Sequence, residues 1–134
     1  SGVPVLTVSS PIDWDELNRS LEENNIDRIF LAGFMKIVPA KFVSKWEKKI
    51  LNVHPSLLPA YPGLKSIEKA FKDGAPVGVT VHEVTAEMDA GPLVRQKRIE
   101  TMPGLDFAAT EFLVHVAEHR LVRESVRTCR REAI

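Results

Sequence analysis

Asn52 and His54 are the first residues in this sequence whose types and spacing could do chemistry. They lie two apart in a short apolar stretch, residues 50–54, which predicts a strand that Pro55 ends. Alternate strand residues face the same side, so both side chains should project from one face, about 7 Å apart. An amide can hydrogen-bond a developing oxyanion while an imidazole donates or moves a proton. The pair therefore predicts oxyanion chemistry at the carboxyl end of a strand.

Asp89 is the carboxylate that could complete such a site. It lies in a predicted loop, residues 86–92, where Gly91 permits a tight turn. A carboxylate beside an imidazole favours the protonated ring and can order a water molecule for proton transfer. Ordinary roles are the alternative: Asn52 capping a turn, His54 as a hydrogen-bonded structural histidine, and Asp89 in a solvated turn. Spacing alone leaves both interpretations open.

Other reactive side chains are weaker candidates. His82 lies alone on a predicted strand, which is usually a structural position, so it ranks below His54. His115 and His119 have the i, i+4 spacing of zinc ligands, but no third ligand accompanies them, and we predict no metal site. The single cysteine, Cys129, is interpreted as a partly exposed free thiol.

Strands and helices alternate along the chain. The predicted strands are residues 3–8, 28–32, 50–54, 77–84 and 93–100, and the predicted helices are residues 14–23, 39–48, 66–72 and 107–130. This order predicts an α/β domain with a mixed sheet flanked by helices. Ligands of such sheets bind at the carboxyl ends of parallel strands, which here means the loops after residues 32 and 54.

Composition narrows the class of protein. A length of 134 residues, 44% of them hydrophobic and 27% charged, fits one globular domain. Eighteen basic residues balance eighteen acidic ones, which argues against a nucleic-acid partner. No apolar run reaches the roughly 20 residues that span a bilayer, and no signal peptide is recognised. We therefore expect a cytoplasmic protein without a membrane partner.

Three separated motifs resemble the folate-dependent formyltransferases. They are residues 31–37 (LAGFMKI), 51–63 (LNVHPSLLPAYPG) and 81–92 (VHEVTAEMDAGP), and they follow one another in the family's order. The resemblance implies a Rossmann-like α/β fold with an open, mostly parallel sheet flanked by helices. Residues 1–134 would form the C-terminal two-thirds of the catalytic domain. The Tyr-Pro-Gly ending of the second motif resembles the branch that formylates glycinamide ribonucleotide in purine biosynthesis.

The resemblance also implies roles for individual residues. Asn52 would hydrogen-bond the formyl oxygen of the cosubstrate 10-formyltetrahydrofolate, His54 would stabilise the oxyanion, and Asp89 would order a water molecule. The implied folate-binding residues are Met35, Lys36, Ile37, Val38, Val84, Thr85, Ala86, Glu87 and Asp89. Gly33 and Glu118 would contact the second small-molecule substrate. No metal is implied.

The family's first strands and its glycine-rich phosphate loop have no counterpart in the sequence. We expect that the chain is incomplete, that another chain supplies the phosphate site, or that full activity is lost. Two alternative functions remain open: a folate-binding module without turnover, and a formyltransferase that acts on another amine. A sheet without those strands would expose an edge, so we expect self-association through it if these 134 residues are the whole protein.

Overall fold

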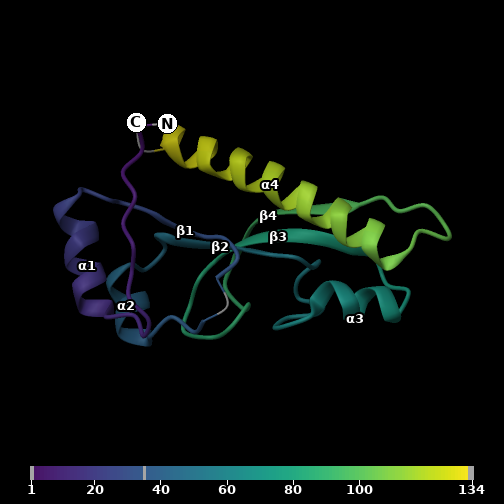
Figure 1. Cartoon of the computed structure of the whole chain (residues 1–134), viewed down its shortest axis with the longest axis horizontal. Coiled ribbons are helices and arrows are strands. Elements are labelled where there is room, and N and C mark those ends of the chain that lie inside the picture. Colours follow the sequence, from purple (N-terminus) through teal and green to yellow (C-terminus); the bar gives the residue numbers. More distant parts are fainter. Residues whose placement is uncertain (1, 35, 133–134) are drawn as a thin grey trace.

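One open, four-stranded sheet in the order β1-β2-β3-β4 forms the centre of the protein (Figure 1). The computed structural model describes residues 2–34 and 36–132. The strands are β1 (Ile29–Leu31), β2 (Ile50–His54), β3 (Val77–Glu83) and β4 (Leu93–Ile99). The helices are α1 (Trp14–Glu23), α2 (Ala40–Lys45), α3 (Ser66–Lys72) and α4 (Phe107–Glu132). β1 and β2 are parallel, whereas β2–β3 and β3–β4 are antiparallel.

The two faces of the sheet are covered by different helices. Leu51 and Val53 of β2 pack with Val114 and Leu121 of α4 in the larger hydrophobic core, which also includes residues of α3. Ile50, which points to the other face, packs with residues of α1 and α2 in a second cluster. Because β2 alternates, Asn52 and His54 project on the face opposite α4.

Local sequence explains where the helices of the second cluster begin. Asp13 caps α1, since its carboxylate accepts a hydrogen bond from the backbone N–H of Glu16 at 3.1 Å. Pro39 precedes α2, and Phe42 of that helix is buried against the edge of the Trp14 ring. The two helices are joined by a buried hydrogen bond of 2.7 Å from the Trp46 indole N–H to the Asn18 side-chain oxygen.

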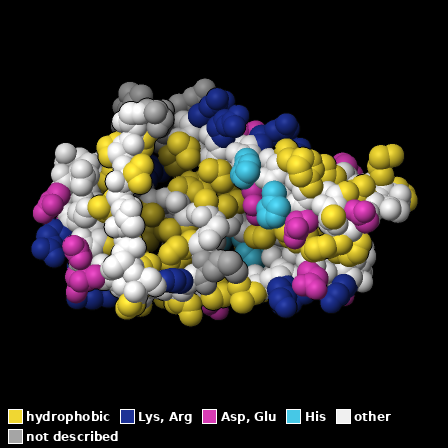
Figure 2. Space-filling model, in the orientation of Figure 1, with side chains coloured by type: hydrophobic (Ala, Val, Ile, Leu, Met, Phe, Trp, Pro, Cys, Tyr) yellow, Lys and Arg dark blue, Asp and Glu magenta, His cyan; other side chains and the backbone are white. Residues whose placement is uncertain are grey.

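Most of the predicted elements are present. Every predicted helix, and every predicted strand from residue 28 onward, is found within a few residues of its predicted bounds. The strand predicted for residues 3–8 was wrong, because the described sheet offers no neighbour with which that segment pairs. Its apolar side chains are instead exposed, Val5 by 92%. Figure 2 shows hydrophobic side chains at the surface beside this extended segment.

The prediction of a mostly parallel sheet was also wrong for the described strands, which form a mixed sheet. Residues 55–76 do not carry the chain back across the sheet, so β3 begins beyond His54 and runs opposite to β2. The turn at residues 84–92 then reverses the chain, and β4 returns along β3. Antiparallel neighbours need no long crossover connection, so the short turn at residues 84–92 suffices between β3 and β4, whereas residues 55–76 form a longer link that includes α3.

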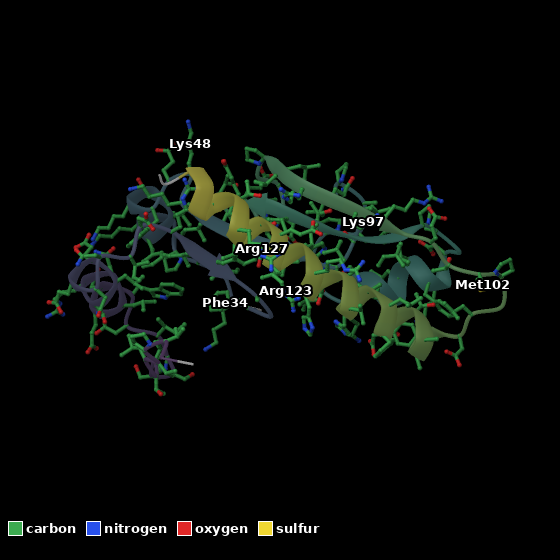
Figure 3. The ribbon with its side chains drawn as sticks, turned by 90° about the horizontal axis from the view of Figure 1, so that it is seen from above. Phe34, Lys48, Lys97, Met102, Arg123 and Arg127 are labelled. Carbon is green, nitrogen blue, oxygen red and sulfur yellow. The ribbon has the colours of Figure 1, made fainter. Side chains whose placement is uncertain are left out.

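The outer surface of α4 is polar and basic over its second half. Arg123 and Arg127 lie one turn apart on its exposed side, and Met102 lies in the loop that joins β4 to α4 (Figure 3). Exposed His115 and His119 lie on the same helix, and Figure 2 shows histidine side chains at the surface of the molecule. Within residues 2–34 and 36–132, no helix combines the length and the apolar character needed to cross a membrane.

The hydrogen bond between α1 and α2 yields a test of the second cluster. Replacing Asn18 by alanine leaves the buried Trp46 N–H without its acceptor. We expect the free energy of unfolding to fall by about 1–3 kcal/mol, measured by urea denaturation. In a Trp46→Phe background the same replacement should cost much less, because no donor is stranded. An equal loss in both backgrounds would show that the hydrogen bond is not the cause.

Candidate active site

The antiparallel register of β2 and β3 places the polar side chains of the site in two cross-strand pairs. Asn52 is paired with His82, and His54 with Thr80, so all four side chains share the face opposite α4. His54, His82 and Thr80 are buried and Asn52 is half-buried. The predicted neighbours Asn52 and His54 are therefore joined by a second histidine, directly across from the asparagine.

The carboxylate of Asp89 lies between the two imidazoles. Its Oδ2 is 3.5 Å from Nδ1 of His54, and its Oδ1 is 3.4 Å from Nε2 of His82. The backbone N–H of Gly63 also donates to Oδ2 at 2.8 Å. The Asp89 side chain is only 9% exposed, so it needs these partners to offset the loss of hydration.

The backbone of the loop delivers Asp89 by a different device from the one predicted. The left-handed conformation falls on Asp89 itself, with φ at 51°, rather than on Gly91. Gly91 serves close packing: a Cβ there would collide with the backbone carbonyl of Glu83. The N–H of Glu83 donates to the carbonyl of Pro92 at 2.9 Å, which closes the base of the loop.

Backbone carbonyls fix which nitrogen of each imidazole carries a hydrogen. Nε2 of His54 lies 2.9 Å from the carbonyl of Tyr61, and Nδ1 of His82 lies 2.9 Å from the carbonyl of Glu83. A carbonyl only accepts, so both of these nitrogens donate. Nε2 of His82 is then free to accept from the amide of Asn52 at 3.3 Å. The two histidines consequently have opposite tautomers.

Tyr61 connects the loop after β2 to helix α3. Its hydroxyl donates a hydrogen bond of 2.7 Å to Oδ2 of Asp73, which directly follows that helix. This bond is the main reason that the pKa of Tyr61 is raised above its usual 10.0, with smaller contributions from desolvation and from the charge of Asp73. The same residue has φ at 53° and presents its carbonyl to His54.

The residues predicted to bind folate lie on two loops that adjoin the second cluster. Val38 and Val84 both pack against that cluster, and Val84 N–H donates to the carbonyl of Ile50 at 2.9 Å. The exposed members are Lys36, Ile37, Thr85, Ala86 and Glu87. Lys36 reaches Ser10 Oγ at 3.4 Å. Met35 lies outside the described residues.

The two residues predicted to contact the second substrate are placed differently. Gly33, with φ at 64°, lies two residues beyond Leu31, and Leu31 pairs with Asn52 where β1 and β2 run parallel. It therefore lies at the carboxyl end of β1, beside the site. Glu118 lies on α4, and its carboxylate contacts Nδ1 of His115 at 3.0 Å. Among the described side chains, Glu118 makes no contact with the cluster around Asp89.

Several groups of the cluster had been missed or ranked low. The sequence ranks His82 below His54. Its place in the cluster follows only from the strand register, which pairs His82 with Asn52. The Tyr61 carbonyl and the Gly63 N–H are backbone groups, which carry no side-chain signal. The sequence string that contains them could indicate a rigid loop but not the direction of its peptide groups.

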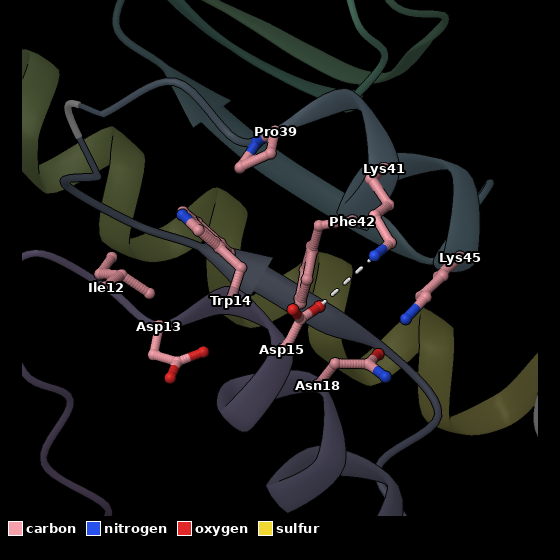
Figure 4. A pocket seen from close by; sticks show the side chains of 9 residues that line it. All are labelled: Ile12, Asp13, Trp14, Asp15, Asn18, Pro39, Lys41, Phe42 and Lys45. Carbon is pink, nitrogen blue, oxygen red and sulfur yellow. Dashed lines mark ion pairs between the residues drawn. The ribbon is translucent and has the colours of Figure 1, made fainter.

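A separate surface pocket of about 320 Å³ lies between α1 and α2. Trp14 and Phe42 form apolar walls, and Lys41 is 3.8 Å from Asp15 at its rim (Figure 4). None of its lining residues belongs to the cluster around Asp89. In the part of the chain that the structure describes, no set of three or more histidine, cysteine or acidic residues is arranged to hold a metal ion.

Comparison with known proteins agrees with this α/β domain. The formyl transferase family model matches residues 9–126. Human trifunctional purine biosynthetic protein adenosine-3 is 37% identical over 128 residues, which cover 90% of this chain and 13% of that protein. Phosphoribosylglycinamide formyltransferase of Bacillus subtilis is 39% identical over 101 residues, 75% of this chain and 52% of that protein.

The solved structures place the fold in the same group. The crystal structure of phosphoribosylglycinamide formyltransferase from Anaplasma phagocytophilum matches with a TM-score of 0.88 at 38% identity, over 94% of this chain and 63% of that chain. The fold and the site thus define the class of protein: an α/β domain with a mixed sheet and a buried carboxylate–imidazole site. The chain belongs to the formyl transferase family. It spans about half of the Bacillus subtilis relative's length.

Opposite tautomers of His54 and His82 can be measured directly by nitrogen NMR of the imidazole rings. We expect the hydrogen of neutral His54 on Nε2 and that of neutral His82 on Nδ1, because each of these nitrogens faces a backbone carbonyl. The exposed His119 serves as the internal comparison and should show no fixed tautomer. Identical tautomers at His54 and His82 would contradict the hydrogen-bond pattern.

Tyr61 provides a pH-dependence test, because it is the only tyrosine of the chain. Its raised pKa means that its bond to Asp73 stabilises the fold fully below pH 10.0 and that this contribution is lost as pH rises through the raised value. Ultraviolet absorbance of tyrosinate should therefore titrate above 10.0. Asp73→Ala, which removes the acceptor, should lower the midpoint, and an unchanged midpoint would mean that the bond does not form in solution.

Proposed function

We propose that this chain transfers a formyl group from 10-formyltetrahydrofolate to the amine of glycinamide ribonucleotide, a step of purine biosynthesis. The observation that carries the proposal is the Asp89 carboxylate held between His54 and His82, beside the amide of Asn52, in a member of the formyl transferase family. The relatives from Bacillus subtilis and Anaplasma phagocytophilum are phosphoribosylglycinamide formyltransferases, which supports the choice of acceptor.

The reaction needs a group that stabilises negative charge on the formyl oxygen. 10-formyltetrahydrofolate supplies the formyl group, and its nitrogen is the leaving group. When the substrate amine bonds to the formyl carbon, the carbonyl electrons move to oxygen. The amide of Asn52 uses one N–H on His82 and retains a second N–H for that oxyanion. A preorganised donor of this kind is worth about 3–4 kcal/mol of barrier.

His54 contributes charge and proton transfer. Protonated on both nitrogens, it donates to Asp89 and to the Tyr61 carbonyl at the same time. The imidazolium stabilises the neighbouring oxyanion, and Asp89 balances its charge. Direct donation to the substrate requires exchange of the Tyr61 contact, since both ring nitrogens are engaged. The attacking amine loses a proton, and the folate nitrogen gains one as its bond to the formyl carbon breaks.

The remaining assignments follow the loops beside the cluster. We assign the folate site to residues 35–38 and 84–87 with Asp89, because Val38 and Val84 of these two segments pack against the same second cluster. Gly33, at the end of β1, is assigned to the amine substrate. Glu118 is assigned to the same substrate by resemblance alone. No metal takes part in the proposed reaction, and we propose a cytoplasmic location.

A folate-binding module without turnover is the second candidate. It is favoured by one observation, that both nitrogens of His54 are already engaged. Such a module would bind folate through the same loops but would not carry out the transfer. Self-association through the free edge of β1 is compatible with either candidate and remains a proposal.

Steady-state formyl transfer to glycinamide ribonucleotide, followed by absorbance, tests the proposal. Asp89→Asn and His54→Ala should each lower kcat by about 100- to 1,000-fold, because each removes a charge that the transition state needs. Asp27→Asn, an exposed acid on the loop before β1, is the matched control and should retain the rate. Folate binding without turnover in the unaltered chain would reject transfer and favour the binding module. Turnover that both site variants retain would reject the site.

A further inference from the structure

Gln96 lies on the edge strand β4 but directs its amide toward the loop after β2, which precedes α3. The strand registers align His54, Thr80 and Gln96 in one row across β2, β3 and β4. Partners in such a row project on the same face, so Gln96 shares the face of the site. The residue as a whole is exposed, whereas its neighbour Thr80 is completely buried.

The amide of Gln96 holds the loop after β2 from outside. Its Nε2 donates to the carbonyl of Leu58 at 2.9 Å and to Oγ1 of Thr80 at 2.9 Å, which uses both of its hydrogens. Thr80 in turn donates to the carbonyl of Ser56 at 2.7 Å and accepts from the N–H of Leu58 at 3.2 Å. Gln96 and Thr80 together therefore fix residues 56 and 58 against the sheet.

The loop is also seated by direct packing. Gly78 lies on the same face as Thr80, and a Cβ at Gly78 would collide with the side chain of Leu57 and the carbonyl of Lys97. The loop therefore packs closely on the sheet at Gly78, and a larger residue at that position would displace it. The Ser56 hydroxyl donates to the carbonyl of Ala60 at 2.7 Å, which passes the constraint along the loop.

The far end of this loop touches both charged members of the site. The carbonyl of Tyr61 accepts from Nε2 of His54, and the N–H of Gly63 donates to Asp89. His82 differs at one nitrogen: its Nδ1 faces the carbonyl of Glu83, outside the loop, whereas its Nε2 contacts Asn52 and Asp89. A displacement of the loop would therefore change the surroundings of His54 and leave those of Nδ1 of His82 in place.

We propose that Gln96 is a positioning residue, which acts through Leu58 and Thr80 to hold the Tyr61 carbonyl and the Gly63 N–H in place. It thereby orients His54 and Asp89 without touching the reacting atoms. The consequence for catalysis rests on the proposed formyl transfer, whereas the effect on His54 does not. The residue lies on an exposed edge strand, so its loss should disturb the loop without dismantling either hydrophobic core.

Gln96→Met tests the proposal, because it keeps the length of the side chain and removes both donors. Nitrogen and proton NMR of the imidazoles is the first readout. We expect the Nε2–H of His54 to exchange with water about five- to tenfold faster, as the Tyr61 contact weakens. The Nδ1–H of His82 should be unchanged. Arg98→Met, two residues along the same edge strand, is the control for the loss of a polar side chain.

Kinetics provides the second readout. We expect kcat to fall about 10- to 100-fold in Gln96→Met, because His54 and Asp89 are held less closely, with the KM for folate unchanged. Gln96→Glu has the same length but sets a carboxylate against the Leu58 carbonyl, so it should act in the same direction. If Gln96→Met does not fold, this second variant decides the question.

The outcomes separate the two proposals. An unchanged His54 signal in Gln96→Met overturns the positioning role, and so does an equal change at His54 and His82, which would reflect general loosening. A selective change at His54 in a chain that shows no formyl transfer supports the positioning role and counts against the proposed function. A selective change accompanied by a lower kcat supports both.

Discussion

The buried carboxylate of Asp89 is the constraint on which the rest of the site depends. A charge withdrawn from water must be compensated. Asp89 accepts from the N–H of Gly63, and it faces the imidazoles of His54 of β2 and His82 of β3, which donate to it when they are protonated. These groups come from three separate segments. Each segment must therefore be held in place before the carboxylate can be buried, and the buried carboxylate in turn holds them together.

The alternation of the central strands allows a hydrophobic core and a polar site to share one thin sheet. Leu51 and Val53 face α4, whereas Asn52 and His54, between and beyond them, face the loops. β3 is buried on both faces, with valines toward α4 and Thr80 and His82 toward the site. The hydrogen-bonding capacity of these buried polar side chains is met, since no buried side-chain nitrogen or oxygen among the described residues lacks a partner.

How much could be predicted from sequence depends on whether a feature is local. The shared face of Asn52 and His54 follows from alternation along a single strand, and the start of α1 follows from Asp13 as its cap. The place of His82 depends on an antiparallel register with β2, which no local pattern contains. The strand predicted at residues 3–8 failed for the same reason, because a strand requires a partner. The direction of the Tyr61 carbonyl depends on a positive φ within a loop, which its side chain does not indicate.

The cluster around Asp89 depends mainly on β2, β3 and the loops next to them. Every described partner of Asp89 lies between β2 and the loop after β3, and β1 contributes only the parallel pairing of Leu31 with Asn52. β1 is at one edge of the sheet and β4, with Gln96, at the other. In our proposal the orientation of the His54 imidazole is set from the β4 side, through the loop that follows His54.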